Sequence, residues 1–147
     1  MPRMQTIILR HNMEVAHRLH LLEGKCENIH GHSMWVELHI TGRVDSNGVL
    51  LSFSDVKKRM RDFLDTNFDH HLLLHEEDPL VQEHSLPGIM LFDNDPTTEN
   101  LAMWIGAWAE LEFGTDYDYK IVVHETNTNA GVWSLTNETG RGNTQGY

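Results

Sequence analysis

The chain of 147 residues is long enough for one domain that buries a substantial core. Its 22 acidic and 11 basic residues give a formal net charge of −11, which argues against nucleic acid or an anionic membrane surface as a partner. One cysteine cannot form an internal disulfide, no apolar run approaches the roughly 18 residues of a membrane span, and the first residues lack a signal-peptide core, so we expect a cytoplasmic protein.

The first half of the chain predicts three strands and one helix, with the strands at residues 5–11, 34–41 and 49–53. The second of these alternates apolar and polar side chains, as a half-buried strand does. A turn signal rich in Asp, Asn and Gly precedes the third. Ser54 is expected to cap the helix, because the apolar residues of 56–64 recur at helical spacing.

The second half predicts one helix and two further strands. Residues 67–95 are rich in His, Asp and Glu and contain two prolines, so we expect an irregular loop. Asp95 and Pro96 mark the start of a helix, since a capping residue and a proline precede apolar residues at helical spacing. The strands are expected at residues 119–124 and 132–135.

These elements predict an α+β fold in which two helices pack on one face of an antiparallel sheet. We expect a single domain at residues 1–136, followed by a flexible tail at residues 137–147, where glycines and uncharged polar residues gather. Such a sheet has open edges, through which single domains often oligomerise.

His30-Gly31-His32, four residues after Cys26, is the most informative motif of the chain. Side chains two residues apart on a strand project from the same face, and two neutral imidazoles make half of a zinc site. His17, on or just after the first strand, can face the same surface as a third ligand. Three protein ligands leave a position open for catalysis. A solvated or hydrogen-bonded pair is the alternative, because 11 histidines produce some pairs by chance.

Three other groups are candidates for proton transfer or binding. A cationic metal nearby would favour the thiolate form of Cys26, although a lone cysteine is more often an inert small residue. Asp69 can orient the imidazole of His70 as a general base, although the dipeptide also fits an ordinary polar loop. Glu125, at the end of an apolar strand, can accept two hydrogen bonds from the amino-imine edge of a pterin or guanine ring; an ordinary strand-end charge is the alternative.

Six motifs in chain order resemble those of the 6-pyruvoyltetrahydropterin synthase / 6-carboxytetrahydropterin synthase family, over roughly residues 11–133. They read Ala-His-Arg-Leu, Cys-x-x-x-His-Gly-His, Phe-Ser-Asp-Val-Lys, Asp-His-His-Leu, Pro-Thr-Thr-Glu-Asn-Leu and Glu-Thr, and they begin at Ala16, Cys26, Phe53, Asp69, Pro96 and Glu125. Each motif alone is modest, whereas six in the right order are highly specific.

The resemblance implies the tunnelling fold, a four-stranded antiparallel sheet with two helices on one face, whose sheets join into a barrel in the oligomer. It implies a homohexamer, built as a dimer of trimers, with active sites between subunits. One Zn²⁺ per subunit would be bound by His17, His30 and His32. The resemblance assigns the proton transfers to Cys26, Asp69 and His70, and the binding of the pterin ring to Glu125, Thr97 and Thr98.

The activity that the resemblance implies is that of a carbon–oxygen lyase. Its substrate would be 7,8-dihydroneopterin triphosphate, and its products 6-carboxy-5,6,7,8-tetrahydropterin, acetaldehyde and triphosphate, on the route to 7-deazaguanine compounds (preQ0 and queuosine). The compact spacing from Cys26 to His32 and the short chain favour this product.

Three alternatives remain open. One is synthesis of 6-pyruvoyltetrahydropterin. Another is a retro-aldol cleavage to a 6-hydroxymethylpterin, for which Glu27 would supply the Glu-x-x-His-Gly-His motif. The third is a pterin binder without turnover. The chain also departs from the family at Ser52, where aspartate is usual, so whatever that aspartate supports is altered.

Overall fold

Two 14-residue strands, β1 (Met4–His17) and β2 (His30–Arg43), form the centre of the sheet in the computed structural model, which describes residues 3–137. They pair antiparallel over their full length. β2 pairs in turn with β5 (Asp118–His124), and β5 with β6 (Ala130–Leu135), both antiparallel. The four antiparallel strands expected for the fold are therefore present, as part of a six-stranded sheet.

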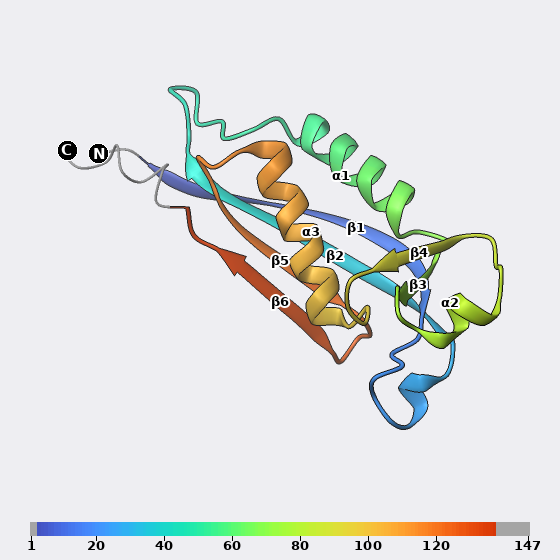
Figure 1. The fold of residues 1–147 in the computed structure, drawn as a ribbon. Helices are drawn as coiled ribbons and strands as arrows, with labels where there is room; N and C mark the ends of the chain where they lie inside the picture. The colour runs from blue at the N-terminus through green and yellow to red at the C-terminus, as the bar shows by residue number, and fades with distance from the viewer. Residues whose placement is uncertain (1–2, 138–147) are drawn as a thin grey trace.

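Two long helices, α1 (Phe53–Asn67) and α3 (Thr98–Phe113), cover one face of this sheet, as expected (Figure 1). The strands alternate more and less buried side chains, so Leu9, Met13 and Val15 of β1 and alternate residues of β2 from Met34 to Ile40 enter the core beneath the helices. The helices bury their apolar positions against them, including Val56, Met60, Leu64, Leu101 and Ile105. None of the helices in residues 3–137 is long and apolar enough to cross a membrane.

The strand predicted at residues 49–53 is wrong. The Asp45 carboxylate accepts from the backbone N–H groups of Asn47 and Val49, which holds this segment in a turn, and α1 begins directly afterwards at Phe53. Ser52, not Ser54, caps the helix by accepting from the Asp55 N–H. Serine and aspartate are both good capping residues, so the departure from the family at Ser52 preserves this role.

The irregular loop predicted at residues 67–95 is also wrong. This segment contains β3 (Leu72–His75), the short helix α2 (Pro79–Glu83) and β4 (Ile89–Phe92). β3 pairs parallel with the end of β1 and with β4, which gives the strand order β4-β3-β1-β2-β5-β6. Four-residue strands in a parallel arrangement lack the alternation that identifies a strand in a sequence.

Two smaller corrections concern the ends of elements. Thr97, not Asp95, caps α3, and its hydroxyl accepts from the Asn100 N–H. Asn137, assigned to the flexible tail, donates from its side chain to Glu110 Oε2 at 2.7 Å. The rest of that predicted tail, residues 138–147, lies outside the described part of the chain.

Candidate metal centre and surrounding site

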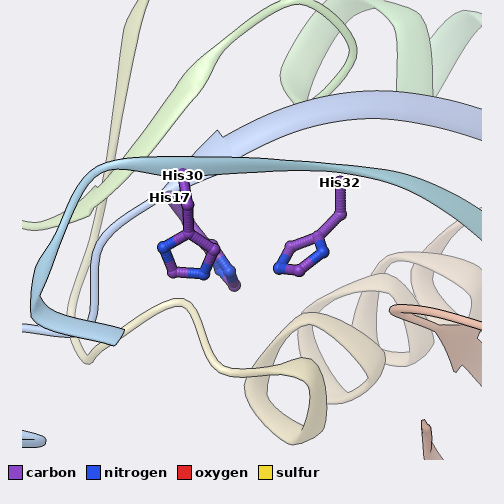
Figure 2. Close-up of side chains that lie close together, drawn as sticks. All are labelled: His17, His30 and His32. Atoms are coloured by element: carbon purple, nitrogen blue, oxygen red, sulfur yellow. The ribbon is translucent and has the colours of Figure 1, made fainter. Parts of the chain in front are cut away.

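Three histidines meet where β1 ends and β2 begins, on the side of the sheet that the helices cover. His17 is the last residue of β1 and lies opposite His30, the first residue of β2; His32 lies opposite Val15. Figure 2 shows the three imidazoles gathered together beside the segment that leads into α3. One nitrogen from each ring lies within 4.8 Å of the others, so the three rings can hold a metal ion.

The hydrogen bonds of these rings leave nitrogen lone pairs free for a metal. The Nδ1 atom of His17 lies 2.8 Å from the Pro96 carbonyl, and that of His30 lies 2.7 Å from the Asn28 carbonyl. A carbonyl only accepts, so both Nδ1 atoms carry the proton and both Nε2 atoms present a lone pair. His17 Nε2 and His32 Nε2 are buried without a hydrogen-bond partner, as unsatisfied ligand atoms would be.

The electrostatics of His17 favour the neutral ring that a metal requires. Its side chain is fully buried, and this desolvation lowers the pKa of His17, while the bond to the Pro96 carbonyl acts in the opposite direction and His30 adds to the lowering. The net direction is downward, so His17 is an uncharged imidazole at neutral pH. The site therefore fits a divalent cation by geometry and by protonation state.

Glu125 lies beside the histidine cluster, directly after β5. One carboxylate oxygen, Oε2, accepts from the Thr98 hydroxyl at 2.6 Å, and the other, Oε1, lies 3.8 Å from His32 Nε2. The approach of β6 to the start of α3 supports this contact, because a Cβ atom at Gly131 would lie only 3.1 Å from Thr98. Thr98 thus orients Glu125, whereas the Thr97 hydroxyl is used in capping α3.

Asp69 and His70 form a second polar pair at the end of α1. Asp69 Oδ2 lies 2.6 Å from His70 Nδ1, and Asp69 Oδ1 accepts from the Glu14 N–H at 2.8 Å. Burial raises the pKa of Asp69, but the hydrogen bonds from Glu14 and His70 outweigh it and lower that pKa overall. Asp69 is therefore a carboxylate that holds His70 Nδ1–H, which leaves the His70 Nε2 lone pair available to accept a proton.

His70 has an unusual backbone for a residue with a side chain. Its φ angle is 60°, in the left-handed region, while its backbone N–H donates to the Glu14 carbonyl at 2.7 Å. Its imidazole is 79% exposed. The hydrogen bonds that the Asp69 carboxylate and the His70 N–H make with the Glu14 backbone hold this strained conformation. An exposed base on a strained backbone is a combination common at functional sites.

Cys26 lies apart from the histidine cluster. It is exposed in the 3₁₀ turn η1 (Lys25–Glu27), within the loop that joins β1 to β2. Its carbonyl accepts from the Leu19 N–H at 2.8 Å, which holds this loop against the end of β1. Its sulfur does not belong to the group of three ligand nitrogens.

A pocket of about 540 Å³ opens at this end of the sheet. Its lining includes His32 from β2 and His70 from the turn after α1, together with Glu14, Ser33 and Pro87. The volume lies within the range of small-molecule sites. The pocket therefore borders one residue of the histidine cluster, His32, and one residue of the Asp69–His70 pair, His70.

Sequence reasoning missed two features of this region. The carbonyl of Pro96, which fixes the His17 ring, has no signal in the sequence beyond the predicted helix start. The structure also brings together a second group of three potential ligands, His20, His75 and Asp95. His75 and Asp95 both lie in residues 67–95, which were predicted to be an irregular loop. The group's only sequence signal was the abundance of His and Asp there.

The comparisons with known proteins agree with these observations. The family model described as "6-pyruvoyl tetrahydropterin synthase" matches residues 6–134. The 6-carboxy-5,6,7,8-tetrahydropterin synthase of Rickettsia typhi is 30% identical over 99 residues, which cover 64% of this chain and 72% of that protein. The 6-pyruvoyl tetrahydrobiopterin synthase of Poecilia reticulata is 29% identical over 135 residues, 83% of this chain and 84% of that protein.

Solved structures show the same fold. A variant of the 6-pyruvoyltetrahydropterin synthase of Plasmodium vivax aligns with a TM-score of 0.75 at 15% identity, over 91% of this chain and 99% of that chain. The 6-pyruvoyl tetrahydropterin synthase of Caenorhabditis elegans aligns with a TM-score of 0.68 at 22% identity, over 92% and 98%. The expected tunnelling-fold class is confirmed, and the chain belongs to the 6-pyruvoyl tetrahydropterin synthase family, whose members act on pterins.

Proposed function

We propose that this protein is a zinc-dependent lyase that converts 7,8-dihydroneopterin triphosphate and water to 6-carboxy-5,6,7,8-tetrahydropterin, acetaldehyde and triphosphate. The observation that carries the proposal is the cluster of His17, His30 and His32, in which two buried Nε2 atoms have no hydrogen-bond partner. The name of the Rickettsia typhi relative supports the carboxy product over the others.

The metal we assign to the cluster is zinc, one ion per subunit. Three neutral imidazoles with a fourth position open are typical of catalytic zinc. When bound there, zinc supplies Lewis acidity that acidifies the two side-chain hydroxyls of the substrate and the carbons that carry them. The protein contributes ring orientation, because the Pro96 and Asn28 carbonyls hold two of the imidazoles through Nδ1–H.

Glu125 is assigned to the pterin ring. Its carboxylate can accept from the two parallel N–H groups of the amino-imine edge. Thr98 already donates to Oε2, which fixes the plane of the carboxylate before the ligand arrives. Thr97 and Thr98 belong to the same proposed subsite, with Thr97 acting through the start of α3 that it caps.

The proton transfers are assigned to Cys26, Asp69 and His70. His70, oriented by Asp69, can remove a proton from carbon or oxygen at its exposed Nε2. Cys26 would act from the opposite side of the substrate as a thiolate. Loss of triphosphate breaks a carbon–oxygen bond and, with the proton shifts, leaves carbonyl groups on the first two side-chain carbons. Water then adds to the carbon next to the ring, and the bond between these two carbons breaks, which leaves the carboxylate and releases the other two carbons as acetaldehyde.

Product analysis tests this proposal. Zinc-loaded protein incubated with 7,8-dihydroneopterin triphosphate is expected to give the 6-carboxy product and acetaldehyde, identified by mass spectrometry. The 6-pyruvoyl product alone would replace the proposed reaction by the first alternative. A 6-hydroxymethylpterin that Glu27→Gln abolishes and Cys26→Ala does not would assign the retro-aldol reaction. Tight binding of the substrate without any product would show a pterin binder.

We further propose a homohexamer, a dimer of trimers, in which each active site is shared between subunits. The edge strands β4 and β6 are available for pairing, and Ile8 and Trp35 are exposed by 51% and 44% on the sheet face opposite the helices. Joining sheets into a barrel would cover both features. It would also let the exposed His70 of one subunit approach the metal cluster of the next.

Complementation tests the shared site. His32→Ala removes a metal ligand and His70→Asn removes the proposed base, so each variant alone should be inactive. Hybrids reassembled from the two are expected to regain activity, because some interfaces combine an intact cluster with an intact His70. Hybrids that stay inactive, or an active monomer in sedimentation experiments, would contradict the shared site. We also propose that the product enters 7-deazaguanine biosynthesis and that the protein works in the cytoplasm.

A further inference from the structure

A second group of metal-ligating side chains lies close to the three-histidine cluster but shares no residue with it. His20 follows β1, His75 ends β3, and Asp95 precedes α3, and one potential ligand atom from each lies within 4.8 Å of the others. Their side chains are exposed by only 12%, 10% and 4%. Ionisable groups buried to this degree are costly unless they are paired or bound to a cation.

A fourth side chain, Asp78, borders this group and is fully buried. Its Oδ1 atom accepts from the Leu80 N–H at the start of α2, while its Oδ2 atom has no hydrogen-bond partner. Oδ2 lies 4.0 Å from His20 Nδ1. Asp78 therefore places an unsatisfied acceptor near His20, at the border of the group.

The hydrogen bonds within the group leave one histidine unpaired as well. His20 Nδ1 lies 2.8 Å from Asp95 Oδ1, and Asp95 Oδ2 accepts from the Leu21 N–H at 3.0 Å. His75 Nδ1 lies 3.8 Å from Asp95 Oδ1 and has no hydrogen-bond partner. Two buried polar atoms of these four side chains, His75 Nδ1 and Asp78 Oδ2, thus have no hydrogen-bond partner, which is rare for buried groups unless a ligand is bound.

The spacing of these atoms suits a tetrahedral cation. Ligands about 2.0–2.1 Å from zinc are separated by about 3.3 Å along each edge of the tetrahedron. Within the group of three, the distances of 2.8 and 3.8 Å from Asp95 Oδ1 to His20 Nδ1 and His75 Nδ1 bracket that value. Asp78 Oδ2, at 4.0 Å from His20 Nδ1, would have to move closer to act as the fourth ligand. Two imidazoles and two carboxylates are also a donor set that zinc and similar divalent ions accept.

The charge balance favours a divalent ion. Asp78 and Asp95 carry two negative charges when ionised, and the nearest guanidinium, that of Arg18, reaches Asp78 Oδ2 at 3.5 Å without a hydrogen bond. A protonated His20 paired with Asp95 is the alternative without a metal. That pair neutralises Asp95 only and leaves His75 Nδ1 and Asp78 Oδ2 without hydrogen-bond partners, whereas a divalent cation could bind both.

We propose that His20, His75, Asp95 and Asp78 bind a second divalent transition-metal ion of the zinc class, in a structural site. With four protein ligands this site has no open position, as structural zinc sites do not. It would join the loop after β1, the end of β3 and the segment before α3. The last of these carries Pro96, next to Asp95, whose carbonyl orients His17 in the first cluster. The second ion would therefore fix the position of the segment whose Pro96 carbonyl orients His17.

Metal stoichiometry tests this site without any assay of activity. The full-length protein is stripped with a chelator, dialysed against buffered Zn²⁺, and its zinc measured by mass spectrometry. Wild type is expected to hold two ions per subunit, and His30→Gln and His75→Gln one each. His84→Gln changes an exposed histidine outside both groups and should leave two. One ion in wild type that disappears in His30→Gln would overturn the proposal.

Thermal stability gives a second readout, and it does not depend on His75→Gln folding well. Added Zn²⁺ is expected to raise the Tm of His30→Gln, because the remaining site binds the folded state only. His30→Gln combined with His20→Gln should lose that shift while keeping its circular dichroism spectrum. A His30→Gln protein that holds no zinc and whose Tm does not respond to Zn²⁺ would contradict the second site.

Discussion

The Nδ1 atom of His17 lies 2.8 Å from the carbonyl oxygen of Pro96, although 79 residues separate them in the chain. This contact ties the end of β1 to the residue before the cap of α3. It fixes the tautomer of a fully buried ring and aims its Nε2 atom at His30 and His32. The candidate metal centre is thus assembled by the packing of α3 on the sheet as well as by the strand register.

Glu125→Gln is expected to weaken substrate binding more than chemistry. The change exchanges a charged acceptor for an amide, which costs about 1.5–3 kcal/mol for hydrogen bonds to a charged group. KM should therefore rise about tenfold or more, with kcat and zinc content close to wild type. Thr98→Val is the matched control, because it keeps the carboxylate and removes only the hydroxyl that orients it. An unchanged KM in Glu125→Gln would remove the proposed pterin anchor.

His70→Asn should show the opposite pattern. Asparagine tolerates the left-handed backbone at φ 60°, so the turn is kept while the base is lost. We expect kcat to fall by about 10²–10⁴, the usual contribution of general acid–base catalysis, with substrate affinity nearly intact in equilibrium binding. His84→Asn, at an exposed position, should retain full activity. A His70→Asn enzyme with wild-type kcat would exclude His70 as the base.

The acid limb of the stability profile should depend on Glu37. Its carboxylate accepts from His124 Nε2 at 2.6 Å and from His39 Nε2 at 2.9 Å on the uncovered sheet face. The hydrogen bond from His124, followed by that from His39, lowers the pKa of Glu37 below its usual 4.5. A lowered carboxylate pKa gives stability that is complete above pH 4.5 and is lost as pH falls through the folded-state pKa.

Glu37→Gln should consequently be less stable than wild type at pH 6, and the difference should shrink steadily below pH 4.5. Urea denaturation at a series of pH values measures this difference. Glu23→Gln, at an exposed carboxylate in the loop after β1, should show no such trend. A constant difference between wild type and Glu37→Gln from pH 6 to pH 3 would contradict the assigned pKa shift.

The histidine cluster was predictable because its geometry is local. His30 and His32 are two residues apart on one strand, and antiparallel pairing of neighbouring strands brings His17 opposite His30. The amphipathic pattern likewise predicted α1 and the four antiparallel strands, since the alternation of β2 persists over its whole length. These features depend on periods of two and 3.6 residues, which a single sequence displays.

The features that sequence reasoning missed depend on contacts between distant segments. β3 and β4 are four residues each and pair parallel, so neither shows a strand period of its own. The left-handed turn at His70, between α1 and β3, is held by hydrogen bonds with Glu14 of β1. The group of His20, His75 and Asp95 forms only because β3 lies beside the end of β1. No local pattern brings His20 together with His75, because the two residues are distant in the sequence.

The release of triphosphate from 7,8-dihydroneopterin triphosphate, followed with and without zinc, tests the central claim most directly. Metal-free wild type is expected to be inactive and to recover turnover on addition of Zn²⁺. His32→Ala should bind less zinc and stay inactive under the same conditions, because its ligand atom is lost from the cluster. Equal turnover by metal-free and zinc-loaded wild type, or full activity in His32→Ala, would contradict a catalytic metal held by these three histidines.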